Sequence, residues 1–146
     1  MNRLEVLFLC TGNSCRSQMA EGWTRHLKGE LIETYSAGIQ PKGLNPDAVR
    51  VMKEAGVDIS SQFSKHICEF DEYRLDWIIT VCGYAEKSCP MIQRKARIFH
   101  KGFEDPPTLA FKAKSELDRL APYRKVRDEI RAFVETLPES LNKESK

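Results

Sequence analysis

Apolar and polar positions follow two patterns along the chain, and each pattern predicts one kind of element. Short apolar runs rich in β-branched residues predict strands that are buried on both faces. Segments with apolar residues every three or four positions predict helices that bury one face. The predicted strands are 4–9, 32–37, 77–81 and 97–99, and the predicted helices are 17–27, 46–55 and the segment from 115 onward, with a weaker helical turn at 68–74.

Prolines set several boundaries within this pattern. Pro46 follows the cap residue Asn45 and is well placed to open a helix. The pair Pro106 and Pro107 predicts a loop that contains no helix, and Pro122 predicts a break or kink in the last helix. The predicted buried face of that helix carries Leu117, Leu120, Val126, Ile130, Phe133 and Leu137.

The order of these elements predicts the fold class. Strands that alternate with helices form βαβ units, in which neighbouring strands run parallel. The chain has 146 residues, which is the size of one domain. We therefore expect a single α/β domain over 1–138, built as three α/β/α layers around a small parallel sheet of about four strands. Residues 139–146 are expected to form a flexible, frayed tail.

The composition indicates in which compartment the protein works and which kinds of partner it has. Hydrophobic residues make up 41% of the chain, yet no apolar run approaches the ~20 residues of a membrane span. The first residues lead directly into a strand and leave no room for a signal peptide, which favours the cytoplasm. The net charge of +2 comes from interspersed charges and favours no nucleic-acid partner. We expect a cytoplasmic monomer.

A polar loop joins the first predicted strand to the first helix. It reads Cys10-Thr11-Gly12-Asn13-Ser14-Cys15-Arg16-Ser17. The N–H groups of such a loop, with the positive end of the helix, can bind a tetrahedral anion. Arg16 can donate to two anion oxygens, and Cys10 beside it is predicted to have a lowered pKa and to act as a nucleophile.

Ser17 is a candidate donor to the Cys10 thiolate and a candidate cap of the helix. An alternative interpretation of Cys10 is a small apolar core residue at the end of a strand. The turn residues and the helix that follow favour the functional interpretation.

The remaining cysteines indicate redox chemistry more than a disulfide framework, because cytoplasmic thiols are kept reduced. Cys82 follows the third predicted strand, and Cys89 comes seven positions later, a spacing that does not fit the common zinc pairs. The alternative is a core thiol and an incidental loop thiol. Cys15 either pairs with Cys10 or packs beneath the helix, and Cys68 is interpreted as structural.

Several motifs together resemble the low-molecular-weight tyrosine phosphatase superfamily, over nearly the whole chain. They are the loop at 10–17, Gln18-Met19-Ala20-Glu21-Gly22, Tyr35-Ser36-Ala37-Gly38 and Asp105-Pro106. The segment from Cys82 to Pro90 is similar to the redox segment of thioredoxin-coupled arsenate reductases. Plain phosphatases of this fold lack that pair of cysteines.

This resemblance implies an arsenate reductase that serves arsenic detoxification. Arsenate would bind in the loop, Cys10 would attack the arsenic, and Asp105 would protonate the leaving oxygen. Cys82 would then attack Cys10 and release arsenite. Cys89 would attack Cys82 in turn, leaving a disulfide that reduced thioredoxin, a transient partner, reopens. No tightly bound cofactor is implied, and phosphate or sulfate would compete with arsenate.

The Cys82 and Cys89 pair makes a geometric demand. A disulfide needs Cα atoms within about 7 Å, whereas seven helical residues span about 10 Å. The segment between the two cysteines must therefore be looped or must unwind on oxidation, and we expect residues 83–92 to be mobile.

Two other functions remain open at this point. The first is a phosphatase or phosphomonoesterase that uses Cys10, Arg16 and Asp105 alone. The second is a module that senses anions or regulates thiols without catalysis. Pro107 stands where tyrosine phosphatases of this fold usually place an aromatic residue, which favours a small inorganic substrate.

The resemblance also suggests a metal site, but one of its ligand residues is different in this chain. Some reductases of the family hold potassium near residues that match Asn13, Glu21 and Ser36, together with an aspartate. Lys65 stands at that fourth position here. An ammonium group cannot ligate a cation, so we expect no potassium site, with Lys65 supplying the positive charge. The histidines fall at no metal-ligand spacing and are expected on the surface; they are His26, His66 and His100.

Overall fold

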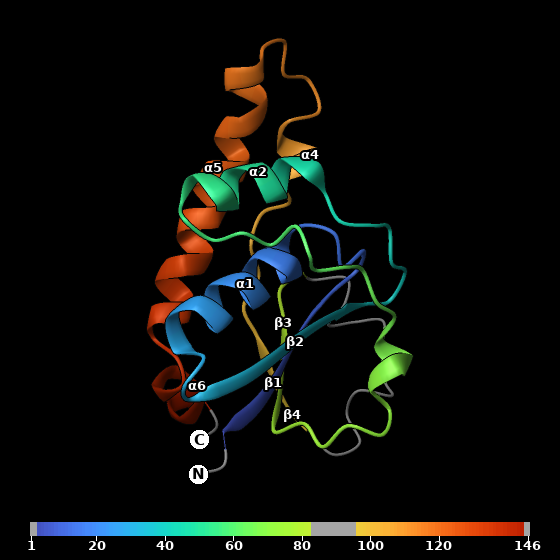
Figure 1. Ribbon diagram of the computed structural model, residues 1–146, viewed down its shortest axis with the longest axis vertical. Helices are drawn as coiled ribbons and strands as arrows, with labels where there is room; N and C mark the ends of the chain where they lie inside the picture. Colours follow the sequence, from blue (N-terminus) through green and yellow to red (C-terminus); the bar gives the residue numbers. More distant parts are fainter. Residues whose placement is uncertain (1–2, 83–95, 145–146) are drawn as a thin grey trace.

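The computed structural model describes residues 3–82 and 96–144 and contains a four-stranded parallel sheet (Figure 1). The strand order is β2-β1-β3-β4. The strands are β1 (Leu4–Cys10), β2 (Ile32–Gly38), β3 (Trp77–Thr80) and β4 (Arg97–His100). The predicted α/β class with a small parallel sheet is confirmed, because each strand pairs in parallel with its neighbours.

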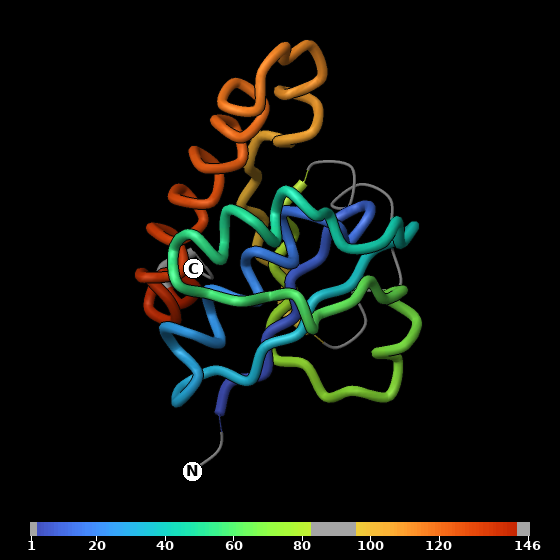
Figure 2. Tube along the Cα trace, turned by 45° about the horizontal axis from the view of Figure 1, so that its top comes forward, coloured from blue at the N-terminus to red at the C-terminus, as the bar shows by residue number. Residues whose placement is uncertain are grey.

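Helices cover this sheet. They are α1 (Arg16–Lys28), α2 (Pro46–Glu54), α4 (Pro106–Leu109), α5 (Glu116–Glu135) and α6 (Glu139–Glu144), with the 3-10 helix η1 (Ile67–Phe70). Helix α5 packs against α1 and α2, and η1 lies on the opposite side of the molecule (Figures 1 and 2). Among the described residues, every helix is too short or too polar to cross a bilayer.

The core lies between β1, β3 and the helices α1 and α5. The five residues of β1 from Val6 to Cys10 and all four of β3 are buried, as expected for central strands of a parallel sheet. Trp23 of α1 is 1% exposed, and its indole N–H donates to the main-chain oxygen of Arg127 in α5, 3.1 Å away. These contacts pack β1, at whose end the polar loop begins, into the core beside α1 and α5.

Two predictions about proline were wrong. Pro106 and Pro107 open helix α4 instead of excluding it, because the first turn of a helix has no use for their missing N–H groups. Helix α5 continues through Pro122, so the predicted break there is wrong; Leu120 and Tyr123 near it are buried, and tertiary packing supports the turn.

The end of the chain also differs from its prediction. The segment from Glu139 forms α6 instead of a frayed tail, and Leu141 is fully buried. Residues 145–146 lie outside the described residues. Leu117 is 70% exposed and lies off the buried face of α5, whereas the other five predicted positions, Leu120 to Leu137, are buried.

Candidate active site

The polar loop turns its carbonyl groups outward. The oxygens of Thr11, Gly12 and Ser14 accept hydrogen bonds from the main-chain N–H groups of Gln40 (2.8 Å), Lys42 (2.9 Å) and Asn45 (3.0 Å), and the Asn13 oxygen accepts from Gln18 and Ser64. The N–H and C=O of a trans peptide point in opposite directions. The N–H groups of residues 12–15 therefore face inward, as binding of a tetrahedral anion requires.

Asn13 holds the centre of this loop. It is fully buried and has a left-handed backbone with φ of 46°. Its Nδ2 donates to the Oγ atoms of Ser17 (2.8 Å) and Ser36 (3.0 Å). Its Oδ1 accepts from the N–H of Lys65 (2.9 Å) and from Nε2 of Gln18 (3.1 Å). Four side-chain hydrogen bonds compensate for a backbone conformation that Asn tolerates better than most residues.

Gly38 at the end of β2 lets the loop lie against the sheet. A Cβ at this position would stand 2.8 Å from both the nitrogen of Asn13 and the oxygen of Thr11. Those are main-chain atoms that cannot move aside, so a glycine is required there.

Cys10 and Cys82 lie together at the base of the loop. Their side chains are 4% and 5% exposed, and the two thiols are hydrogen-bonded to one another. The hydroxyl Oγ1 of Thr11 lies 3.2 Å from the Cys82 sulfur. The sequence places these two cysteines 72 positions apart, and the pairing of β1 with β3 brings them into contact.

The lowered pKa predicted for Cys10 is wrong for this arrangement. The hydrogen bond with Cys82 and then burial raise the pKa of Cys10, and together they outweigh Arg16 and the N–H of Gly12, which lower it. The sequence shows the arginine but not the second sulfur. Cys82 is therefore the neighbour that raises the pKa of Cys10 the most.

Arg16 reaches from the first turn of α1 to the segment before α4. One terminal nitrogen donates to the Phe103 oxygen (2.9 Å), and the other lies 3.3 Å from Oδ1 of Asp105. Its Nε is buried and has no hydrogen-bond partner within the described residues. A buried N–H without a partner beside the loop is suited to an anion oxygen.

Asp105 is the N-cap residue of α4, and its side chain is 37% exposed. The Thr108 hydroxyl donates to its Oδ2 over 2.6 Å. The structure thus brings together Cys10, Arg16, Cys82 and Asp105, which the sequence singled out. Cys89 and the segment 83–92 lie outside the described residues.

The other predicted loop residues have mixed roles. Ser17 is buried as an acceptor for Asn13 and lies inside α1, whose N-cap residue is Cys15, so the predicted capping by Ser17 is wrong. Cys15 is 4% exposed and packs in the core as a thiol, and burial raises its pKa. Cys68 is exposed and takes no part in the core. All three histidines are exposed, as predicted; they are His26, His66 and His100.

The sequence did not predict three of the hydrogen-bond partners of the loop. They are Gln18, the hydroxyl of Ser64 and the main-chain oxygen of Phe103. Gln18 had one available signal, because it is a polar residue among buried positions of α1. A main-chain oxygen and a single serine carry no such signal.

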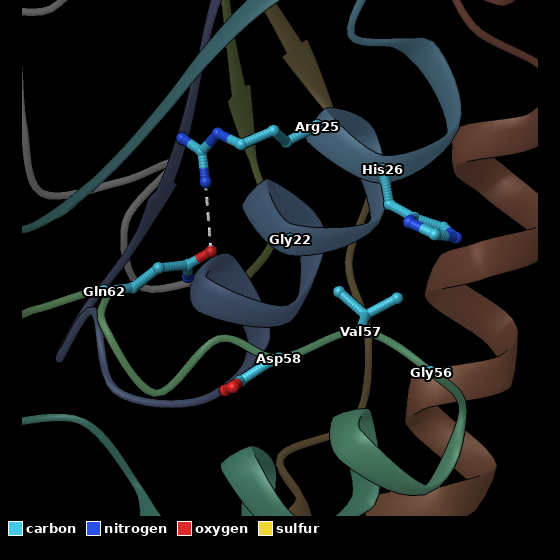
Figure 3. A pocket seen from close by; sticks show the side chains of 7 residues that line it. All are labelled: Gly22, Arg25, His26, Gly56, Val57, Asp58 and Gln62. Carbon is cyan, nitrogen blue, oxygen red and sulfur yellow. Dashed lines mark hydrogen bonds between the residues drawn. The ribbon is translucent and has the colours of Figure 1, made fainter.

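A separate cavity of about 390 Å³ lies between α1 and the segment 56–62 (Figure 3). Arg25, His26, Asp58 and Gln62 are among the residues that line it, and a terminal nitrogen of Arg25 donates to Oε1 of Gln62. Of the candidate catalytic residues that the structure describes, none lines this cavity. It is therefore distinct from the site at the polar loop of residues 10–17, which we call the anion loop from here on.

Comparison with known proteins identifies the family of this chain. The family model "Low molecular weight phosphotyrosine protein phosphatase" matches residues 5–146. The arsenate reductase of Halalkalibacterium halodurans is 44% identical over 140 residues, which are 96% of this chain and 99% of that protein.

Two solved structures share the fold. One is described as an arsenate reductase in the phosphate binding state; it is 33% identical, has a TM-score of 0.78 and covers 92% of this chain and 95% of its own. The other is a thioredoxin-dependent arsenate reductase of Corynebacterium glutamicum, 26% identical with a TM-score of 0.71, covering 96% of this chain and 62% of its own. On the family match and these likenesses, the chain belongs to the low molecular weight phosphotyrosine protein phosphatase family.

Proposed function

We propose that this protein is an arsenate reductase in which Cys10 attacks arsenate and Cys82 completes the reduction. The observation that carries the proposal is the contact of the two buried thiols at the base of the anion loop. A phosphatase reaction needs one nucleophile, whereas reduction of arsenate needs a second thiol within reach of the first. The similar proteins named above are arsenate reductases.

Substrate binding uses the inward N–H groups of residues 12–15 and the guanidinium of Arg16. Arsenate is a tetrahedral oxyanion, so successive N–H groups and a planar donor fork suit its oxygens. Phosphate has the same shape and should compete, in keeping with the phosphate-bound state of one relative.

The first step forms a bond between the Cys10 sulfur and arsenic. The thiolate attacks arsenic(V), and one oxygen leaves as water after Asp105 supplies a proton. Arg16 lies 3.3 Å from Asp105 and so connects the bound anion to the acid. The N–H of Gly12 and Arg16 favour the thiolate form of Cys10.

The second step transfers two electrons to arsenic. The Cys82 thiolate attacks the Cys10 sulfur, and the sulfur–arsenic bond breaks with its electron pair staying on arsenic. Arsenic(V) becomes arsenic(III), which leaves as arsenite, and a Cys10–Cys82 disulfide forms. Cys89 then attacks Cys82, frees Cys10, and leaves a disulfide that thioredoxin reduces with two electrons. This relay belongs in the reducing cytoplasm.

A phosphomonoesterase activity is the second candidate. Cys10, Arg16 and Asp105 meet independently of the other cysteines, and the family model is named for phosphatases. We expect it as a slow side reaction, because the same loop admits phosphate esters.

The deciding experiment follows NADPH oxidation with arsenate, thioredoxin and thioredoxin reductase. Cys82→Ser and Cys89→Ser should each lose steady turnover and still cleave an aryl phosphate. The matched control is Cys68→Ser, an exposed cysteine that should leave turnover unchanged. Unchanged arsenate turnover in the first two variants would contradict the relay and leave the phosphatase as the better function.

A further inference from the structure

A group of charged side chains around the buried Glu21 contacts the residues that hold Asn13 of the anion loop. Glu21 of α1 is 6% exposed. Its Oε1 accepts from Ser36 Oγ over 2.5 Å, and its Oε2 accepts from a terminal nitrogen of Arg25 over 2.5 Å. The ammonium of Lys65 lies 3.9 Å from Oε1, and the Lys65 side chain is only 12% exposed.

The residues present do not fit the potassium ion that the family resemblance suggests near this place. Oδ1 of Asn13 already accepts from the Lys65 N–H and from Gln18. Oγ of Ser36 donates to Glu21 and accepts from Asn13. Two cationic side chains already face one buried carboxylate, so an added cation would meet net positive charge at short range.

We propose that the Lys65 ammonium is a built-in counter-ion that positions Asn13, and that it makes the anion loop independent of any monovalent metal ion. Lys65 contributes to the position of Asn13 in two ways, one direct and one indirect. Its main-chain N–H donates to Oδ1 of Asn13 directly. Its ammonium balances Glu21, which holds Ser36, which in turn accepts from Nδ2 of Asn13. Lys65 is thus a positioning residue for the proposed arsenate site.

The ammonium is itself held in place. Its Nζ donates to the Phe63 oxygen over 2.6 Å and lies 4.7 Å from the centre of the Phe63 ring. Arg25 is closer to Glu21, but its side chain is 53% exposed and water weakens its charge. Lys65, at 12% exposed, acts in a drier environment, where a charge at 3.9 Å has more effect.

The test compares potassium with sodium at equal ionic strength, with two measurements that need no arsenate. The first is Tm. The second is the phosphate concentration that halves the rate at which iodoacetamide alkylates Cys10. The wild-type protein should give the same two values in both salts. A higher Tm or tighter phosphate protection in potassium than in sodium would overturn the proposal.

Variants at position 65 sharpen the test. Lys65→Ala should lower Tm by about 5 °C and weaken phosphate protection about fivefold, because Glu21 loses a buried partner. Ammonium or potassium, which have similar sizes, should restore part of both losses, and lithium should not. Lys53→Ala, at an exposed lysine, is the matched control.

A third variant keeps the proposal testable if Lys65→Ala does not fold. Glu21→Gln with Lys65→Met removes both charges, so its phosphate protection should be the same in potassium and sodium. Cation dependence that persists there, or a Lys65→Ala protein that behaves like Lys53→Ala, would overturn the role of Lys65. Since neither readout uses arsenate, an inactive reductase would not affect this outcome.

Discussion

The anion loop and the acid segment around Asp105 meet at one site but are held in place by different means. Asn13 in the loop is fully buried, and its hydrogen bonds come from α1, β2 and the segment before η1. Asp105 is half-buried at the start of a four-residue helix, and Thr108, three positions away, is its hydrogen-bond donor. Within residues 3–82 and 96–144, its long-range ion-pair partner is Arg16 at 3.3 Å.

Because the two regions are held differently, substitutions in them should have different effects on stability and on activity. The loop geometry depends on contacts that only the complete fold supplies, so damage to the loop should reduce stability and activity together. The acid depends on local contacts near the surface, where ion pairs contribute little to stability. Damage to the acid should therefore reduce activity alone.

Asp105→Asn should lower catalysis far more than stability. Loss of the general acid should lower arsenate turnover by about 10²–10³-fold, while Tm should change by no more than about 3 °C. Steady-state kinetics and a thermal melt measure the two quantities. Glu104→Gln, an exposed neighbour, is the control. A loss of Tm as severe as that of a loop variant would remove the contrast between the two regions.

Asn13→Ala should show the largest effect on stability. It leaves the main-chain N–H of Lys65 and the hydroxyl partners of Asn13 without their bonds, which should cost about 2–3 kcal/mol in the free energy of unfolding. Urea unfolding followed by circular dichroism measures it. A stability equal to that of the wild-type protein would mean that the loop is held by its main-chain bonds alone.

Cys82→Ala should make Cys10 more acidic. The Cys82 contact is the largest cause that raises the pKa of Cys10, so its removal should lower that pKa. The alkylation rate of Cys10 should then rise at neutral pH, and its pH profile should move to lower pH. Cys68→Ala is the control, and a profile shifted to higher pH would contradict the assignment.

Thr108→Ala should have the smallest effect. It removes the hydroxyl that donates to Asp105 over 2.6 Å. The loss of one exposed hydrogen bond should lower turnover about threefold through poorer placement of the acid, with no measurable change in Tm. A tenfold loss or more would show that the acid segment depends on this local contact as strongly as the loop depends on Asn13.

Much of the fold was predictable because its signals are local. The apolar runs that form β1 and β3 and the cap at Asn45 follow directly from residue types. The missed elements, α4 and α6, are short helices. In α4 the two prolines occupy the first turn, where they open a helix instead of breaking one, and in α6 Leu141 is fully buried by contacts that the local sequence does not reveal.

The four strands, the longer helices and the chemistry of the loop followed from the sequence alone, because they depend on neighbouring residues. The sequence also singled out Cys10, Arg16, Cys82 and Asp105. Only the tertiary structure decided that Cys82 raises the pKa of Cys10, because that contact depends on how β1 pairs with β3. The family resemblance grouped Lys65 with Glu21, but the 3.9 Å separation and the burial of both side chains come from the tertiary structure alone.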